Sequence, residues 1–145
     1  MRLSAAAIAV SLAWTACSLA DPGKPQRFDM GTGFSLRVSE AALAVDGSWR
    51  IGFTGVVADS RCPKGEQCVW AGDATVRVWA QQGTEPRQVR ELHTASGAAQ
   101  VVALRGHELR LLGLDPYPVS GKPIAGGDYL ATLTLSRSST LAPER

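Results

Sequence analysis

Few residues of the sequence are spaced as in a catalytic or metal-binding site, and the three cysteines are the main candidates. Cys62 and Cys68 are separated by five residues, and Cys17 lies near the N-terminus in a segment with the character of an export signal. Cys17 is then either removed or lipidated, which leaves an even pair. In an oxidising compartment that pair is expected to form a disulfide. A structural zinc site needs four closely spaced ligands, and the sequence has no second cysteine pair.

The two histidines offer little catalytic chemistry by themselves. His107 begins a stretch that starts like the zinc-binding H-E-x-x-H helix motif, but Leu111 occupies the position of the second histidine. The sequence has no G-x-S-x-G nucleophile elbow and no glycine-rich phosphate loop. We therefore predict no catalytic residue, no metal and no cofactor. The alternative that stays open is a small hydrolase or metal-binding protein that uses His93 or His107.

The most distinctive segment runs from Asp59 to Gly72 and reads DSRCPKGEQCVWAG. Pro63 and Gly65 occupy positions that a type I turn favours, so the two sulfurs can meet across a compact bend. Closing so short a loop contributes only about 2 kcal/mol by chain entropy. The bridge is therefore expected to fix the shape of the loop more than the stability of the domain.

A rigid loop loses little entropy when it binds, which makes this segment the candidate binding site. We expect the bridge to hold three charged side chains in a fixed arrangement, namely Arg61, Lys64 and Glu66. Trp70 is expected to pack against the bridge or the sheet, and Asp59 completes the set of candidate binding residues. One version of this hypothesis is a protease inhibitor in which Lys64 or Arg61 enters a specificity pocket.

Two further tryptophans lie in stretches of alternating polar and apolar residues. Trp49 is expected in the core. Trp79 shares one face of its predicted strand with Thr75 and Arg77, opposite the valines of the same strand. An exposed aromatic ring beside an arginine is common in sites that contact proteins or carbohydrates. We therefore treat Trp79 as a candidate exposed contact.

The first residues have the order of a secretory signal. A positive start is followed by the apolar run 3–13 and by small residues up to Ala20, so residues 1–20 are predicted to be a cleaved signal peptide. The same region resembles a bacterial lipobox ending at Cys17, which would then carry lipid after removal of residues 1–16. Both alternatives place the protein in the bacterial cell envelope, as a periplasmic or secreted protein or as an outer-membrane lipoprotein.

The charge balance limits the choice of partners. The chain has 15 basic and 13 acidic residues, and one basic residue, Arg2, lies in the export signal, which leaves 14 against 13. Without a basic stripe, nucleic acid and anionic membrane surfaces are poor partners. We expect an unknown protein or another envelope component as the partner, and membrane contact only through lipid on Cys17. The mature chain is long enough for one hydrophobic core.

Alternation with a period of two dominates the mature chain and predicts β-strands. The runs 41–45 and 49–54 flank Asp46-Gly47, which predicts a hairpin, although 41–45 and 98–104 also permit short helices. The polar run 87–93 is expected to lie at a sheet edge. Strands that recur about every ten residues predict an all-β fold, an antiparallel β-sandwich of about seven to nine strands with an immunoglobulin-like outline.

The domain bounds follow from the same pattern. The sandwich is expected to span residues 34–136. A polar, proline-bearing leader is expected over 21–33, and a flexible serine-rich tail over 137–145.

Three stretches carry a resemblance to known proteins: the DSRCP…CxWAG segment, the run LRLLGLDPYP and the closing run GGDYLATLTL. Together they resemble a family of uncharacterised bacterial secreted proteins and lipoproteins that place the cysteine motif between strands. The resemblance covers roughly residues 34–135. It implies an exported β domain and no known activity.

Overall fold

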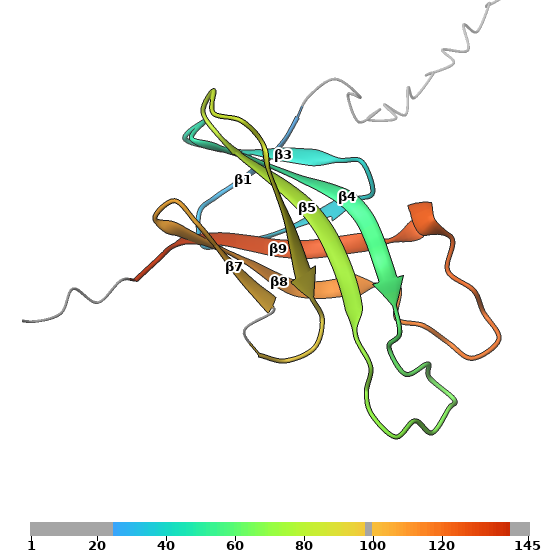
Figure 1. Cartoon of the computed structure of the whole chain (residues 1–145). Helices are drawn as coiled ribbons and strands as arrows, with labels where there is room; N and C mark the ends of the chain where they lie inside the picture. The colour runs from blue at the N-terminus through green and yellow to red at the C-terminus, as the bar shows by residue number, and fades with distance from the viewer. Residues whose placement is uncertain (1–24, 98–99, 140–145) are drawn as a thin grey trace, which may run out of the picture.

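The computed structural model describes residues 25–97 and 100–139, which form two β-sheets around one apolar core (Figure 1). The predicted all-β sandwich is confirmed. The expected export segment with Cys17 lies outside the described residues, as does most of the expected tail. Within the described part, no helix is long and apolar enough to span a membrane.

The described residues contain nine strands, which divide into sheets of five and four. The five-stranded sheet has the order β1 (Gln26–Phe28), β3 (Ala41–Ala44), β4 (Trp49–Asp59), β5 (Ala74–Gln82) and β6 (Gln88–His93). The four-stranded sheet has the order β2 (Gly33–Arg37), β9 (Leu130–Arg137), β8 (His107–Asp115) and β7 (Val101–Leu104). A short 3-10 helix, η2 (Gly126–Asp128), precedes β9.

Each sheet is built mainly from consecutive strands. β3 to β6 are antiparallel neighbours in chain order, and so are β7 to β9, while β2 pairs with β9. The two-sheet outline of an immunoglobulin domain is present, but this meandering strand order differs from the order of such domains. The polar strand β6 lies at a sheet edge, as predicted.

The prediction that the leader lies outside the sandwich is wrong for the short segment β1. β1 lies within residues 21–33 and pairs with β3 in parallel, which makes it part of the sheet. Its buried residue Phe28 stacks on Phe34 with ring centroids 4.1 Å apart. At the other end, β9 includes Arg137, which we expected to be the first residue of the tail. The segments that also permitted helices contain β3 and β7 instead.

The alternating pattern explains the core. Inward-facing residues of both sheets are fully buried, including Leu36, Ile51, Phe53 and Leu133, and the prediction that Trp49 is a core residue is confirmed. The predicted hairpin joins β3 to β4. At its turn, Asp46 accepts hydrogen bonds from the backbone and side chain of Ser48, and Gly47 adopts a φ of 75° that favours glycine.

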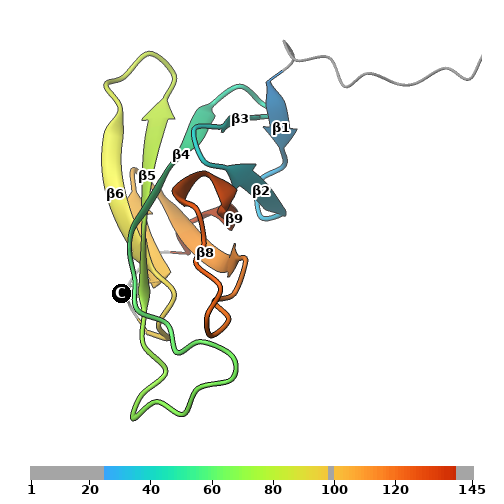
Figure 2. The same ribbon diagram turned by 90° about the vertical axis from the view of Figure 1, so that its right-hand side faces the viewer.

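The longest neighbouring strands carry the segment with the two cysteines away from the sandwich. β4 and β5 pair from Trp49 to Asp59, and two irregularities in β4 bend the pair. The connection between them projects from the end of the molecule opposite β1 (Figure 1). Figure 2 shows the same projection from the side, next to the connection between β8 and β9.

Candidate functional site

The connection between β4 and β5, residues 60–73, is here called the Cys loop. Its base continues the strand ladder, because the Ser60 amide donates to the Asp73 carbonyl and the Cys62 amide to the Ala71 carbonyl, each at 2.7 Å. Gly72 allows this close approach, since a Cβ there would lie 1.9 Å from the Ser60 carbonyl oxygen. The base of the loop is therefore held as tightly as a strand pair.

Cys62 and Cys68 form the predicted disulfide, with their Cα atoms 5.9 Å apart. A turn lies within the ring that the bridge closes, but it begins one residue later than predicted and is not type I. The Glu66 amide donates to the Pro63 carbonyl at 3.1 Å, and Gly65, the third residue of this turn, has a φ of 94°. This half of the loop is fixed covalently and by the backbone.

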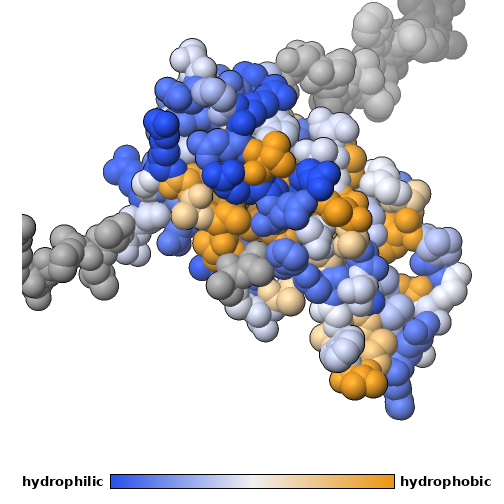
Figure 3. Space-filling view, in the orientation of Figure 1, coloured by the Kyte–Doolittle hydropathy of each residue, from blue (hydrophilic) through white to orange (hydrophobic). Residues whose placement is uncertain are grey.

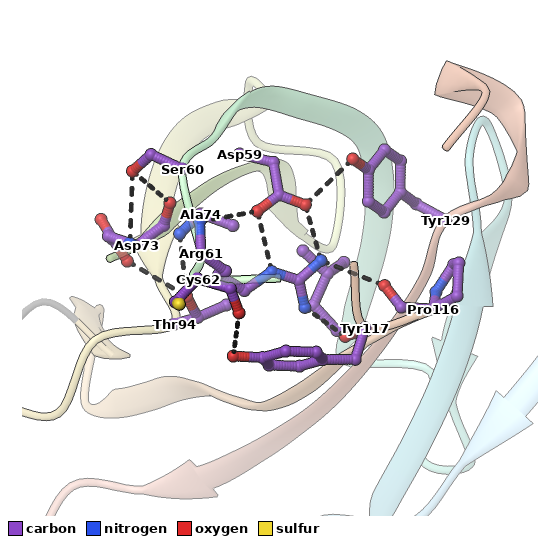
Figure 4. A network of polar contacts seen from close by, with 11 residues as sticks. Asp59, Ser60, Arg61, Cys62, Asp73, Ala74, Thr94, Pro116, Tyr117 and Tyr129 are labelled. Atoms are coloured by element: carbon purple, nitrogen blue, oxygen red, sulfur yellow. Dashed lines mark hydrogen bonds and ion pairs between the residues drawn. The ribbon is translucent and has the colours of Figure 1, made fainter. Parts of the chain in front are cut away.

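Arg61 is buried, so the prediction that it is displayed to a partner is wrong. Its guanidinium forms a two-pronged ion pair with Asp59, with Nε–Oδ1 at 2.8 Å and an Nη–Oδ2 distance of 2.6 Å. The other N–H groups donate to the carbonyls of Leu114 at 2.8 Å and Pro116 at 3.1 Å (Figure 4). Arg61 thus ties the start of the Cys loop to the end of β8.

Asp59 is equally committed to this network. Its Oδ2 also accepts a hydrogen bond from the Tyr129 hydroxyl at 3.0 Å. Burial alone raises the pKa of Asp59, but hydrogen bonds from the side chain and backbone of Arg61 outweigh it, so this pKa lies below its ordinary value. Burial is the largest cause that raises the pKa of Tyr129, and the hydrogen bond to Asp59 raises it further. The charged Asp59–Arg61 pair is therefore the stable form.

A second loop, residues 116–124, supports the Cys loop from one side. The Tyr117 hydroxyl donates to the Cys62 carbonyl at 3.0 Å. The backbone of Lys64 exchanges hydrogen bonds with the stretch around Val119, and the Ser120 hydroxyl donates to the Glu66 carboxylate at 2.8 Å. The side chains of Lys64 and Glu66 are exposed, as predicted, but Glu66 is already bonded to this second loop.

The tip of the Cys loop, Val69–Trp70, projects beyond all of these contacts. Val69 is 98 % exposed and Trp70 is 79 % exposed, so the prediction that Trp70 packs against the bridge or the sheet is wrong. In Figure 3, which shares the orientation of Figure 1, the Cys loop lies in the lobe at the lower right, and the lower end of this lobe carries hydrophobic residues. Tyr117 and Val119 of the second loop are also exposed large hydrophobic residues. Val69 was missed because an apolar residue in a loop has no periodic signal.

Asp73 and His93 form a contact that resembles part of a catalytic triad. Asp73 Oδ2 lies 2.5 Å from His93 Nδ1, and Oδ1 accepts from the Ala95 amide at 2.9 Å. Within residues 25–97 and 100–139, no hydroxyl or thiol forms a hydrogen bond with the other ring nitrogen of His93, and the Ser60 hydroxyl donates to the Asp73 carbonyl instead. The contact therefore anchors the Cys loop to β6 and lacks the nucleophile that a triad needs.

The same contacts set the protonation of Asp73. Burial alone raises its pKa, but hydrogen bonds from His93, Ala95 and Thr94 outweigh it and leave the pKa below the ordinary value. Asp73 is therefore ionised whenever the domain is near neutral pH.

The remaining sequence candidates lie elsewhere. His107 is the first residue of β8, and its ring lies edge-on to Trp49 with the ring centroids 5.3 Å apart. His93 lies on β6 of the other sheet. Trp79 lies on the outer face of β5 and is only half-buried. No group of three or more metal-ligating side chains is found among the described residues.

Comparisons with protein-family models, with curated proteins and with solved structures found no match to this chain.

Proposed function

We propose that this protein is an exported, non-catalytic domain of the bacterial cell envelope that binds a partner protein through the tip of the Cys loop. The observation that carries the proposal is the exposure of Val69 and Trp70, which is 98 % and 79 %. Tryptophan is among the residues that contribute most to binding when a partner buries it. An apolar pair at the end of a projecting loop fits a concave, apolar pocket.

Preorganisation supports the same proposal. The disulfide, the Arg61 network and the second loop all constrain the Cys loop before any partner arrives. A loop ordered in this way loses less conformational entropy on binding than a free loop does. These contacts lie below the tip, so they leave its side chains available.

The orientation of the loop favours a protein as the partner of the tip. The alternative partner would be the membrane in which a lipid on Cys17 would be anchored. The tip lies at the end of the sandwich opposite β1, where the described chain enters the domain (Figure 2). A domain anchored by its N-terminal side presents this end away from the anchor. An anchored protein would therefore offer the tip to other envelope proteins.

The inhibitor alternative is a narrower form of this proposal, with different contact residues. Arg61 is buried, so it cannot enter a protease pocket. The side chain of Lys64 is exposed, but its backbone is paired with the stretch around Val119 and is not free to pair with a protease as a substrate does. The exposed apolar tip would be the part that a protease binds. A protease as the captured partner would support this narrower form.

The test compares two variants of the mature protein. Val69→Ser/Trp70→Ser removes the apolar tip, and Val45→Ser removes an exposed valine at the hairpin between β3 and β4 as a matched control. Each protein is used to capture partners from envelope extract, and the captured protein is then purified. The dissociation constant between the captured protein and the tip variant should be at least tenfold higher than with the parent, and the control variant should bind like the parent.

Two results would contradict the proposal. The first is a tip variant that binds the purified partner as tightly as the parent does. The second is tip-dependent binding to lipid vesicles with no protein partner, which would make the tip a membrane contact. Equal melting temperatures for parent and variants show that the exposed substitutions have not changed the fold.

A further inference from the structure

Trp79 lies flat on the backbone of its neighbouring strand. It is opposite Gly52 of β4, where a Cβ would come within 2.1 Å of the Cε2 atom and 2.3 Å of the Nε1 atom of the indole. Any residue other than glycine would push the ring away. Gly52 therefore fixes the position of the Trp79 ring on the outer face of the five-stranded sheet.

Arg87 covers the opposite face of the same indole. Its Cζ atom is 3.9 Å from the ring centroid, which is a close cation–π contact. The contact restricts the guanidinium, and a guanidinium held on an aromatic face keeps N–H donors available for other groups. Trp79 is thus covered on both faces, so its contribution to a contact site is to hold Arg87 in place.

Two arginines at this position form no ion pair with any residue that the structure describes. Arg50 and Arg87 are both exposed and line, with Trp79, a shallow pocket of about 410 Å³. Among the described residues, no Asp or Glu lines this pocket or forms an ion pair with either arginine. Arg77 on the same sheet face differs, because it is paired with Glu91 at 2.8 Å.

We propose that Arg50 and Arg87 bind an oxyanion, a carboxylate or a phosphate, on a ligand that lies against the outer face of the five-stranded sheet. Guanidinium groups bind both anions through paired, charge-assisted hydrogen bonds. The stacked Arg87 is preorganised for this geometry. Because the pocket is open to solvent, added salt weakens the binding. The site is separate from the tip of the Cys loop and does not depend on the function proposed for it.

The test titrates the mature protein with three small probes. Trigalacturonic acid carries carboxylates, a hexose monophosphate carries a phosphate, and maltotriose is a neutral control. Binding is followed by NMR through the indole N–H of Trp79 and the side-chain N–H of Arg87. We expect saturable shifts with at least one anion and none with maltotriose, and the anion that saturates at the lower concentration identifies the source of the oxyanion.

Variants then assign the binding to the two arginines. Arg50→Gln/Arg87→Gln should weaken binding at least tenfold, whereas Arg77→Gln, the matched control, should change it less than about twofold. Arg87→Lys keeps the charge but loses the planar fork, so an intermediate loss is expected. The proposal is overturned by a lack of saturable shifts with both anions, by equal shifts with maltotriose, or by undiminished binding to the double variant.

Discussion

Replacing Arg61 with alanine tests how the Cys loop is fixed to the sandwich. The guanidinium makes two hydrogen bonds to Asp59, one to the Leu114 carbonyl and one to the Pro116 carbonyl. In Arg61→Ala, the Asp59 carboxylate, of which only 11 % is exposed, keeps the Tyr129 hydroxyl but loses its counter-charge. Two carbonyls also lose a donor. The loss of these four hydrogen bonds destabilises the folded state.

The size of the effect follows from this burial. Removing one partner of a buried ion pair costs about 3–5 kcal/mol. The Asp59–Arg61 pair lines a pocket open to solvent, which can rehydrate the remaining carboxylate, so the lower end applies. We expect a loss of about 3 kcal/mol in the free energy of unfolding for Arg61→Ala. For a domain of this size, that loss lowers the melting temperature by about 10 °C.

Urea denaturation measures this loss against a matched arginine. Arg77 and Glu91 form an ion pair in which both side chains are 45 % exposed, so Arg77→Ala is expected to cost about 0.5 kcal/mol or less. Asp59→Asn/Arg61→Ala should be more stable than Arg61→Ala, because no lone carboxylate is then buried. If Arg61→Ala is no more destabilising than Arg77→Ala, the Arg61 network does not stabilise the loop and the reasoning fails.

Three further predictions concern the bridge, the packing of the sheet and pH. Cys62→Ser/Cys68→Ser should lower the free energy of unfolding by about 2 kcal/mol in urea denaturation. Gly52→Ala should cost about 1–3 kcal/mol by displacing the indole beside it, whereas Gly113→Ala, with no atom near the added methyl, should not. The lowered pKa of Asp73 predicts stability that is complete above the ordinary value of 3.8 and lost as pH falls through the folded pKa, so acid unfolding of Asp73→Asn should depend less on pH.

Regular strands could be predicted from the sequence because burial repeats every second residue. Trp49 lies in such a run, and its burial follows from the alternation. β1 escaped prediction because it has three residues, of which only Phe28 is buried, too few for a period to be visible. The disulfide could be predicted from the count of cysteines together with the export signal that the sequence predicts.

The surroundings of the Cys loop could not be predicted, because they depend on contacts between distant residues. Arg61 finds its carbonyl partners 53 and 55 positions further along the chain, at the end of β8 and directly after it. A charged residue in a loop is usually exposed, and only that distant segment makes its burial favourable. Trp70 shows the opposite case: tryptophans are usually well buried, but no element of the described chain reaches the tip to cover it.

The burial of Arg61 and the exposure of Trp70 show that different residues stabilise the Cys loop and form its exposed tip. The buried Arg61 network and the bridge carry the stabilising contacts, whereas the side chains of Val69 and Trp70 make almost none. An apolar side chain left in water forgoes about 1.5–3 kcal/mol that its burial would contribute, so the fold alone gives no reason for such a tip. Substitutions at the tip should therefore leave the melting temperature unchanged and weaken the binding of the partner. Substitutions at Arg61 should lower both the melting temperature and the affinity for the partner. A tip variant that unfolds at a much lower temperature would show that the exposed pair belongs to the fold after all.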